Sequence, residues 1–272
     1  MKQVWALIPL KDFASAKTRL ASTLSAESRR SLALAMALDV ANALVHSNAV
    51  ARVIMVSDIP DLEQLMGIEG VGHFDTRSAQ GLNEDLEVAA AWAGTQGATH
   101  VLIAHADLPR LTPRAIDYFI LAAEDLSECR VRAAACKQGS GTNLLLAPLP
   151  LPLPLVFGKN SLARFCQTAA AAHVAIDVIN DSSLAADVDD PDDLMALAVG
   201  CSRGERIGGA TSGFLLSALF AQADSCVRTG TPVQPAVWTG SVWRGAARQD
   251  TAATKNERTD SQYSTLCATS MG

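Results

Sequence analysis

Apolar runs bounded by polar or turn-forming residues predict the strands of a buried sheet. Two runs are short, Val4–Ile8 and Val53–Ser57, and the clearest spans His100–Asp107. Between the first two, apolar residues recur at three- and four-residue spacing and predict an amphipathic helix of about five turns; they are Leu32, Met36, Val40, Ala43 and Leu44. The order strand, helix, strand, short helix, strand predicts an α/β fold with a mostly parallel sheet and helices on both faces.

The chain beyond residue 80 continues this alternation with more irregular connections. Helices are expected after Gly81-Leu82-Asn83, after Thr112-Pro113 and after Asp190-Pro191, each with helix-start chemistry. A weak strand, Arg132–Cys136, comes between them. The prolines of residues 148–154 indicate an extended surface connection instead of a central strand. These elements complete a predicted domain over residues 1–200.

Composition changes after residue 200, where Ser, Thr, Gly and Gln dominate. Residues 201–272 are therefore expected to form a polar C-terminal extension, partly disordered, with a short helix through Gly213–Phe220. The extension has more basic than acidic residues, so the formal net charge of -6 comes from the first 200 residues. An acidic domain argues against a nucleic-acid partner, for which a basic excess is typical.

The cysteines and the N-terminal sequence indicate the compartment. Six cysteines are scattered without a Cys-x-x-Cys pair, which favours reduced thiols in the cytoplasm. The start, Met-Lys-Gln-Val-Trp, lacks the apolar stretch of a secretory signal, and no window approaches a membrane span. We therefore expect a soluble cytoplasmic protein without a membrane partner. Homodimers are common among soluble enzymes, so a homodimer is an open alternative to a monomer.

A basic loop follows the first strand of this acidic domain. Lys11, Lys17 and Arg19 lie among small side chains just after Pro9. Ligands bind at the carboxyl ends of strands in open α/β sheets, so the loop is a candidate polyanion site. A solvated basic loop explains the same residues equally well.

Acidic residues at two later positions form a candidate cation site. Asp107 ends the clearest strand, and since Thr112 is available to cap the next helix, a magnesium ligand is favoured over a turn former. Asp187 and Asp189 are left over once Asp190 is assigned as a helix cap. Their spacing puts both on one side of an extended segment. They either join Asp107 around a cation or form a solvated acidic turn.

Three small-residue turns are candidate ligand sites. Asn83 is either the N-cap of its helix or, following Gly81, part of a helix start whose free amides approach a ligand. Gly139–Asn143 is compatible with a tight hairpin or with an anion-binding turn. The third turn places Gly158 before a helix that Ser161 is expected to cap.

Two polar side chains are assigned structural roles. Asp39 lies on or beside the apolar face of its helix and needs a partner, for which Arg19 is the candidate. His105 has no metal-ligand spacing with other His or Cys residues and is interpreted as structural.

In this order along residues 3 to about 198, these motifs resemble the guanylyltransferases of deazaflavin coenzyme biosynthesis. The motifs are Ile8-Pro-Leu-Lys11, Ala16-Lys-Thr-Arg-Leu20, Ala35-Met36 with Asp39-Val40, Gly81-Leu-Asn83, Ala106-Asp-Leu-Pro109, Gly139-Ser-Gly-Thr-Asn143, Phe157-Gly158 with Ser161, and Asp187-Val-Asp189 before Pro191.

The resemblance implies a three-layer, Rossmann-like nucleotidyltransferase fold and transfer of GMP from GTP to a phosphorylated three-carbon acid, with magnesium as cofactor. The acid is 2-phospho-L-lactate, phosphoenolpyruvate or 3-phospho-D-glycerate. The implied site residues fall into four groups: catalytic Lys17, Arg19 and Asp107; nucleotide-binding Pro9, Lys11, Lys17, Gly81 and Asn83; acceptor-binding Thr142, Gly158 and Ser161; and metal-binding Asp107, Asp187 and Asp189.

Two departures from the family pattern bear on the acceptor. Cys136 stands where we expect Asp, and Phe165 stands where we expect His. Because these changes suggest a remodelled acceptor pocket, 3-phospho-D-glycerate is favoured. Three alternatives are a transferase of the same fold acting on a sugar phosphate or a molybdenum-cofactor pterin, a non-catalytic nucleotide-binding protein, and an interaction module acting through the C-terminal extension.

Overall fold

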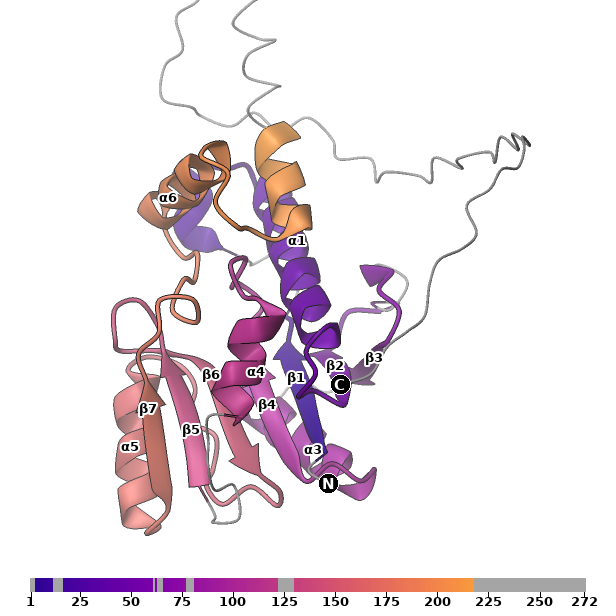
Figure 1. The fold of residues 1–272 in the computed structure, drawn as a ribbon, viewed down its shortest axis with the longest axis vertical. Helices are drawn as coiled ribbons and strands as arrows, with labels where there is room; N and C mark the ends of the chain where they lie inside the picture. The colour runs from indigo at the N-terminus through magenta and orange to yellow at the C-terminus, as the bar shows by residue number, and fades with distance from the viewer. Residues whose placement is uncertain are drawn as a thin grey trace, which may run out of the picture. The chain divides into compact units, whose positions relative to one another are not determined.

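One mixed sheet forms the centre of the computed structural model, which describes residues 3–11, 17–60, 62, 66–76, 81–121 and 130–217. The strand order over these residues is β3-β2-β1-β4-β6-β5-β7 (Figure 1). In chain order the strands are β1 Val4–Pro9, β2 Arg52–Ser57, β3 Val71–Asp75, β4 His100–Ala104, β5 Arg130–Ala135, β6 Thr142–Pro148 and β7 Ala175–Ile179. Strand β6 is antiparallel to its neighbours β4 and β5, and the other neighbouring pairs are parallel.

Helices cover both faces of this sheet. They are α1 Ala26–Val45, α3 Leu82–Thr95, α4 Pro113–Leu121, α5 Ser161–Ala171 and α6 Pro191–Ser202, with a short 3-10 helix η2 at Thr18–Ser22. Helices α1 and α4 lie on one face and α3 and α5 on the other (Figure 1). The prediction of a three-layer α/β fold is therefore confirmed. The short helix expected between β2 and β3 lies largely outside the described residues.

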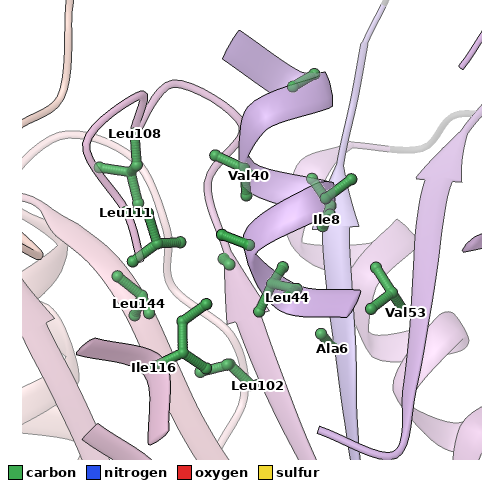
Figure 2. Close-up of a cluster of buried hydrophobic side chains, with 14 of the residues drawn as sticks. Ala6, Ile8, Val40, Leu44, Val53, Leu102, Leu108, Leu111, Ile116 and Leu144 are labelled. Carbon is green, nitrogen blue, oxygen red and sulfur yellow. The ribbon is translucent and has the colours of Figure 1, made fainter. Parts of the chain in front are cut away.

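Successive side chains of β1 point to opposite faces of the sheet, so this one strand packs against helices of both layers. Val4, Ala6 and Ile8 pack under α1 and α4, whereas Trp5 and Leu7 face α3. Figure 2 shows the first of these cores, with Ala6 and Ile8 among side chains contributed by α1, α4 and the neighbouring strands. A strand buried on both faces reads as a continuous apolar run, as this one does.

Several predicted helix starts are confirmed and two are wrong. The side chain of Ser25 accepts a hydrogen bond from Ser28 N at 3.1 Å, and Asp190 forms a capping box with Asp193 before Pro191. Asn83 is not an N-cap, because Gly81 occupies that position. Ser161 is not a cap either; Asn160, with a left-handed backbone, precedes it, and Ser161 is the first helical residue.

Residues 203–217 pack on the preceding part of the chain. Residues 209–217 are helical, four residues earlier than the predicted start, and Phe214 and Leu215 join a third apolar cluster with residues of α1, η2 and α6. All of these residues fall in the same compact unit as the sheet. The predicted boundary at residue 200 stays a prediction, since residues 218–272 lie outside the described part. None of the described helices is long and apolar enough to cross a membrane.

Candidate active site

A cavity opens where the sheet reverses its strand order, at the carboxyl ends of the adjacent parallel strands β1 and β4. Its volume is about 400 Å³, and three separate segments supply its predicted site residues: Pro9 at the end of β1 with Lys11 just beyond it, Lys17 before η2, and Asp107 after β4. A smaller cavity of about 160 Å³ also contains Pro9 and Lys11 in its wall. Strand ends at such a reversal are where open α/β sheets bind ligands.

Lys17 forms two ion pairs in this cavity. Its Nζ lies 2.6 Å from Asp107 Oδ2 and 2.9 Å from Asp189 Oδ1, and the Lys17 side chain is only 12% exposed. Arg19 lies on the outside, with its side chain 74% exposed and Nη1 3.7 Å from Asp189 Oδ2. The structure thus brings together Lys17, Arg19, Asp107 and Asp189. Lys17 and Asp189, the two residues of this group that are furthest apart in the sequence, are separated by 172 positions.

The opposite charges of Lys17 and Asp107 favour the ionised form of both side chains. Burial alone would lower the pKa of Lys17, but the nearby carboxylates of Asp107 and Asp189 outweigh it and raise that pKa above its usual value. Burial would raise the pKa of Asp107, and the Lys17 ammonium outweighs this too, so the Asp107 pKa is lowered. Both groups are therefore charged at neutral pH.

Asp187 occupies a different environment from Asp189, although both were predicted as metal ligands. It is buried, and its Oδ1 accepts hydrogen bonds from Asn143 Nδ2 at 3.2 Å and from the Lys137 backbone N at 3.4 Å. Burial raises the pKa of Asp187, the Asn143 hydrogen bond opposes this, and the negative charge of Asp107 adds to the rise. The Val188 backbone N donates to Asp107 O at 3.2 Å, which holds the acidic loop against the end of β4.

The acidic residues are compatible with a metal ion without forming a complete protein cage. Among the described residues, no three acidic, His or Cys side chains converge on one point as ligands. Asp107 Oδ1 is nevertheless buried and has no hydrogen-bond partner. Magnesium is commonly held by one or two carboxylates together with substrate phosphates, so one carboxylate oxygen without a partner fits that chemistry. Magnesium binding stays a prediction.

The three predicted acceptor residues lie together at the start of β6 and the start of α5. Ser161 Oγ donates to Thr142 Oγ1 at 3.1 Å, and both residues are buried. The Ser161 backbone N donates to Gly158 O at 3.1 Å. Gly158 has φ +122° with open space where a Cβ would stand, so its conformation and not crowding favours glycine.

Asn83 connects the predicted nucleotide half to this acceptor loop. Its Oδ1 accepts from Phe157 N at 2.8 Å and its Nδ2 donates to Phe157 O at 3.3 Å. The side chain therefore fixes the residue before Gly158 from the first turn of α3. Gly81 is the N-cap residue of that helix, with φ +144°, and a Cβ there would come within 2.6 Å of Glu84 Oε2, so both its backbone conformation and its surroundings favour glycine.

Two polar residues near the site were missed or undervalued in the sequence. His105 lines the 400 Å³ cavity, its ring centroid is 5.3 Å from that of Phe157, and its buried Nε2 has no hydrogen-bond partner. Asn143 donates through Nδ2 to both Leu184 O and Asp187 Oδ1. Both residues could have been found from their neighbours in the sequence, because His105 lies two residues before Asp107 and Asn143 directly follows Thr142.

Asp39 does not pair with Arg19, which corrects the sequence interpretation. Its carboxylate accepts from Ala210 N at 2.9 Å and Thr211 N at 2.8 Å, at the start of the helix at residues 209–217. Free backbone amides at the start of a helix attract a carboxylate, so the Asp39 carboxylate is stabilised without a cation.

The two departures from the expected pattern affect the acceptor side indirectly. Cys136 Sγ accepts from Gly141 N at 3.0 Å, inside the turn that leads to Thr142. Phe165 is fully buried, and its ring centroid is 5.1 Å from that of Phe157 in an edge-on arrangement. Both residues therefore shape the backbone that carries the acceptor groups.

Comparison with known families gives a match over most of the chain. Residues 4–206 match the family model described as "Guanylyl transferase CofC like". The chain is 35% identical over 193 residues to the phosphoenolpyruvate guanylyltransferase of Conexibacter woesei, covering 71% of this chain and 86% of that protein. It is 30% identical over 194 residues to the 2-phospho-L-lactate guanylyltransferase of Methanocorpusculum labreanum, covering 71% and 82%. It is 31% identical over 204 residues to the 3-phospho-D-glycerate guanylyltransferase of Phenylobacterium zucineum, covering 73% and 91%.

Solved structures show the same fold at low identity. A putative nucleotide-diphospho-sugar transferase from Desulfovibrio desulfuricans G20 aligns with a TM-score of 0.63 at 16% identity, over 84% of this chain and 98% of that one. A nucleotidyl transferase from Methanothermobacter aligns with a TM-score of 0.53 at 16% identity, over 75% and 99%. These likenesses support the nucleotidyltransferase-type fold.

Proposed function

The chain belongs to the family of CofC-like guanylyl transferases, and on this premise we propose that it transfers GMP from GTP to the phosphate of a three-carbon phospho-acid and releases pyrophosphate. The proposed setting is deazaflavin coenzyme biosynthesis. The favoured acceptor is 3-phospho-D-glycerate, with 2-phospho-L-lactate and phosphoenolpyruvate as the other members of the class.

The observation that carries this proposal is that a charged cluster and a small group of polar residues lie near the same edge of the sheet. Lys17 lies just before η2 and Asp107 in the turn after β4, while Thr142 and Ser161 lie at the start of β6 and α5. Asn83 joins the two through Phe157. A site that must hold two anionic substrates side by side needs such a pair of neighbouring subsites.

The proposed reaction requires positioning of the two substrates and compensation of their negative charges more than it requires proton transfer. A phosphate ester has its second pKa near 6, so the acceptor oxygen is already largely ionised at neutral pH and needs no general base. Lys11, Lys17 and Arg19 bind the phosphates of GTP and reduce the repulsion between the two substrates. Thr142, Ser161 and the backbone at Gly158 orient the acceptor.

Magnesium, when bound, supplies further charge stabilisation to the phosphates. Asp107 would hold it, through the carboxylate oxygen that has no hydrogen-bond partner, together with Asp187 or Asp189. The contribution of the protein is to keep these carboxylates ionised and oriented. Lys17 does this for Asp107, whereas the hydrogen bond from Asn143 orients Asp187 and opposes the rise in its pKa that burial causes.

The acceptor is the least constrained part of the proposal. The relatives are named for three different acids at similar identity. Cys136 and Phe165 contact the segments that carry the acceptor residues. Because Asp and His were expected at these two positions, we propose that this protein prefers a different acceptor from relatives that have them. The preference for 3-phospho-D-glycerate is therefore a hypothesis about these two positions.

A direct assay tests reaction and acceptor together. Purified protein with GTP and magnesium is given each of the three acids, a sugar phosphate or no acceptor, and pyrophosphate release is followed while the product is identified by mass spectrometry. We expect release with the three-carbon acids, fastest with 3-phospho-D-glycerate, and strong loss in Asp107→Asn. Release with the sugar phosphate alone would refute the acceptor class. GTP binding without turnover on any acceptor would favour the non-catalytic alternative.

A further inference from the structure

The ammonium of Lys17 lies at the centre of the acidic residues that the proposed function assigns to a metal ion. It contacts Asp107 Oδ2 at 2.6 Å and Asp189 Oδ1 at 2.9 Å. These carboxylates come from the end of β4 and from the segment before α6. Two carboxylates within reach of a single cation repel each other when that cation is removed, so Lys17 stabilises their approach.

The same residue is expected to bind the phosphates of GTP, and the two roles compete. An ammonium that neutralises Asp107 and Asp189 offers a triphosphate little net charge. Arg19 lies 3.7 Å from Asp189, and Lys11 lines the same cavity as Lys17 and Asp107, so cationic and acidic side chains partly compensate each other's charge in this region. A nucleotide alone therefore meets a nearly neutral group, and a divalent ion alone meets an ammonium already in place.

The backbone of Lys17 is also in an unusual conformation. Its φ of 51° and ψ of 45° place it in the left-handed region immediately before η2. Residues other than glycine adopt this region infrequently, and such outliers concentrate where a residue changes its position during function. The residue that forms both ion pairs is therefore also one with an uncommon backbone conformation, which marks it as a candidate functional position.

We propose that Lys17 is an internal cation that occupies the metal position between Asp107 and Asp189 and leaves it for the nucleotide phosphates when a divalent ion and the nucleotide bind together. The inference rests on the proposed function for the identity of these ligands. Asp107 Oδ1, buried and without a partner, is the oxygen that the incoming ion gains in addition to the oxygen that Lys17 releases.

Such an exchange couples the binding of the divalent ion to the binding of the nucleotide. A metal ion that displaces the ammonium makes Lys17 available to the phosphates, and phosphates that attract the ammonium expose the carboxylates to the metal. By linkage each ligand raises the affinity for the other by the same factor. The metal alone should consequently bind weakly to the wild type, because it bears the whole cost of displacing Lys17.

The test measures binding of Mn²⁺ to the full-length protein without nucleotide, by electron paramagnetic resonance of the free ion. Four proteins are compared: wild type, Lys17→Met, which keeps the side-chain length without the charge, Lys17→Arg, which keeps the charge, and Lys17→Met combined with Asp107→Asn. Circular dichroism checks the fold of each, and Lys17→Gln replaces Lys17→Met in the same comparison if the methionine variant does not fold.

We expect Lys17→Met to bind Mn²⁺ about 5- to 150-fold more tightly than wild type, the usual range for coupling between sites. Lys17→Arg should bind no more tightly than wild type, and Asp107→Asn should abolish the gain. Equal or weaker binding by Lys17→Met overturns the proposal, as does a gain that survives Asp107→Asn or appears in Lys17→Arg. None of these results depends on turnover, so failure of the proposed reaction would be recognised separately in the acceptor assay.

Discussion

Replacing Asp39 by alanine tests whether residues 208–217 are part of the core that supports the site. The Asp39 side chain in α1 is buried, and its two carboxylate oxygens accept from Ala210 N at 2.9 Å and Thr211 N at 2.8 Å. A Cβ at Gly208 would overlap this carboxylate, so the backbone approaches it as closely as glycine permits. Alanine at position 39 removes both acceptors and leaves two amides without partners.

The expected cost follows from these contacts. A hydrogen bond to a charged group contributes about 1.5–3 kcal/mol, and a carboxylate at a partly buried helix N-terminus up to about 2 kcal/mol. The two figures describe overlapping parts of one interaction, and water can replace some of it, so we expect Asp39→Ala to lower the free energy of unfolding by about 2–4 kcal/mol. For a domain of roughly 200 residues this corresponds to about 5–15 °C in Tm.

Urea unfolding of the full-length protein, followed by circular dichroism, measures this difference. Asp39→Asn is the matched control, because its single carbonyl oxygen satisfies one amide and its loss of stability should be intermediate. A change below about 0.5 kcal/mol in Asp39→Ala, the size of an ordinary surface substitution, would show that the contact with residues 210 and 211 contributes nothing to the fold.

Three further predictions concern the site and its surroundings. Ser161→Ala removes the hydroxyl that faces Thr142 and should raise KM for the acceptor acid while leaving KM for GTP nearly unchanged, measured by varying each substrate in the pyrophosphate assay. Asn143→Ala removes the donor that orients Asp187 and should weaken Mn²⁺ binding in the presence of a non-hydrolysable GTP analogue by about 10- to 100-fold, as measured by titration. Burial alone would raise the pKa of Asp117, but hydrogen bonds from Ser47 and Ala49 outweigh it and lower that pKa from its usual 3.8. The unfolded chain then takes up the proton first, so the stability that Asp117 contributes at neutral pH is lost as the pH falls below about 4, and the difference in urea midpoint between wild type and Asp117→Asn should shrink from pH 7 to pH 3.

Each of these predictions has a result that contradicts it. Equal changes in both KM values for Ser161→Ala would indicate a general loss of structure. Full Mn²⁺ affinity in Asn143→Ala would show that Asp187 is not oriented by this amide. A stability difference for Asp117→Asn that stays constant with pH would exclude a contribution from the ionised carboxylate.

The fold was predictable because its strands are buried on both faces. Runs such as Val4–Ile8 and His100–Ala104 contain almost no polar residues, and the helix with Leu32, Met36 and Val40 keeps a regular spacing. These local patterns determine strand and helix without knowledge of tertiary contacts. The predicted strand extended to Asp107, but β4 ends at Ala104, so Asp107 lies in the turn after the strand and not at its last position.

The pairing of distant side chains could not be read from the sequence. Lys17 and Asp189 are 172 residues apart, and nothing local to either indicates that the lysine contacts Asp189 as well as Asp107. Asp39 shows the same limit, because its partners are backbone amides, which every residue except proline carries. Asn83 was assigned to its own helix start from local propensity, whereas tertiary contact with Phe157 decides its role.

The antiparallel direction of β6 has a consequence for how acceptor preference can diverge within such a fold. Because β6 runs antiparallel to β4 and β5, it begins at the edge of the sheet where those two strands end, so its first residue, Thr142, and the preceding turn lie beside the segment that follows β4. The turn at residues 136–141 is a short hairpin connection, and its length and composition can vary without moving a strand. Substitution within this hairpin therefore offers a route to a new acceptor that leaves the residues proposed to bind GTP unaltered.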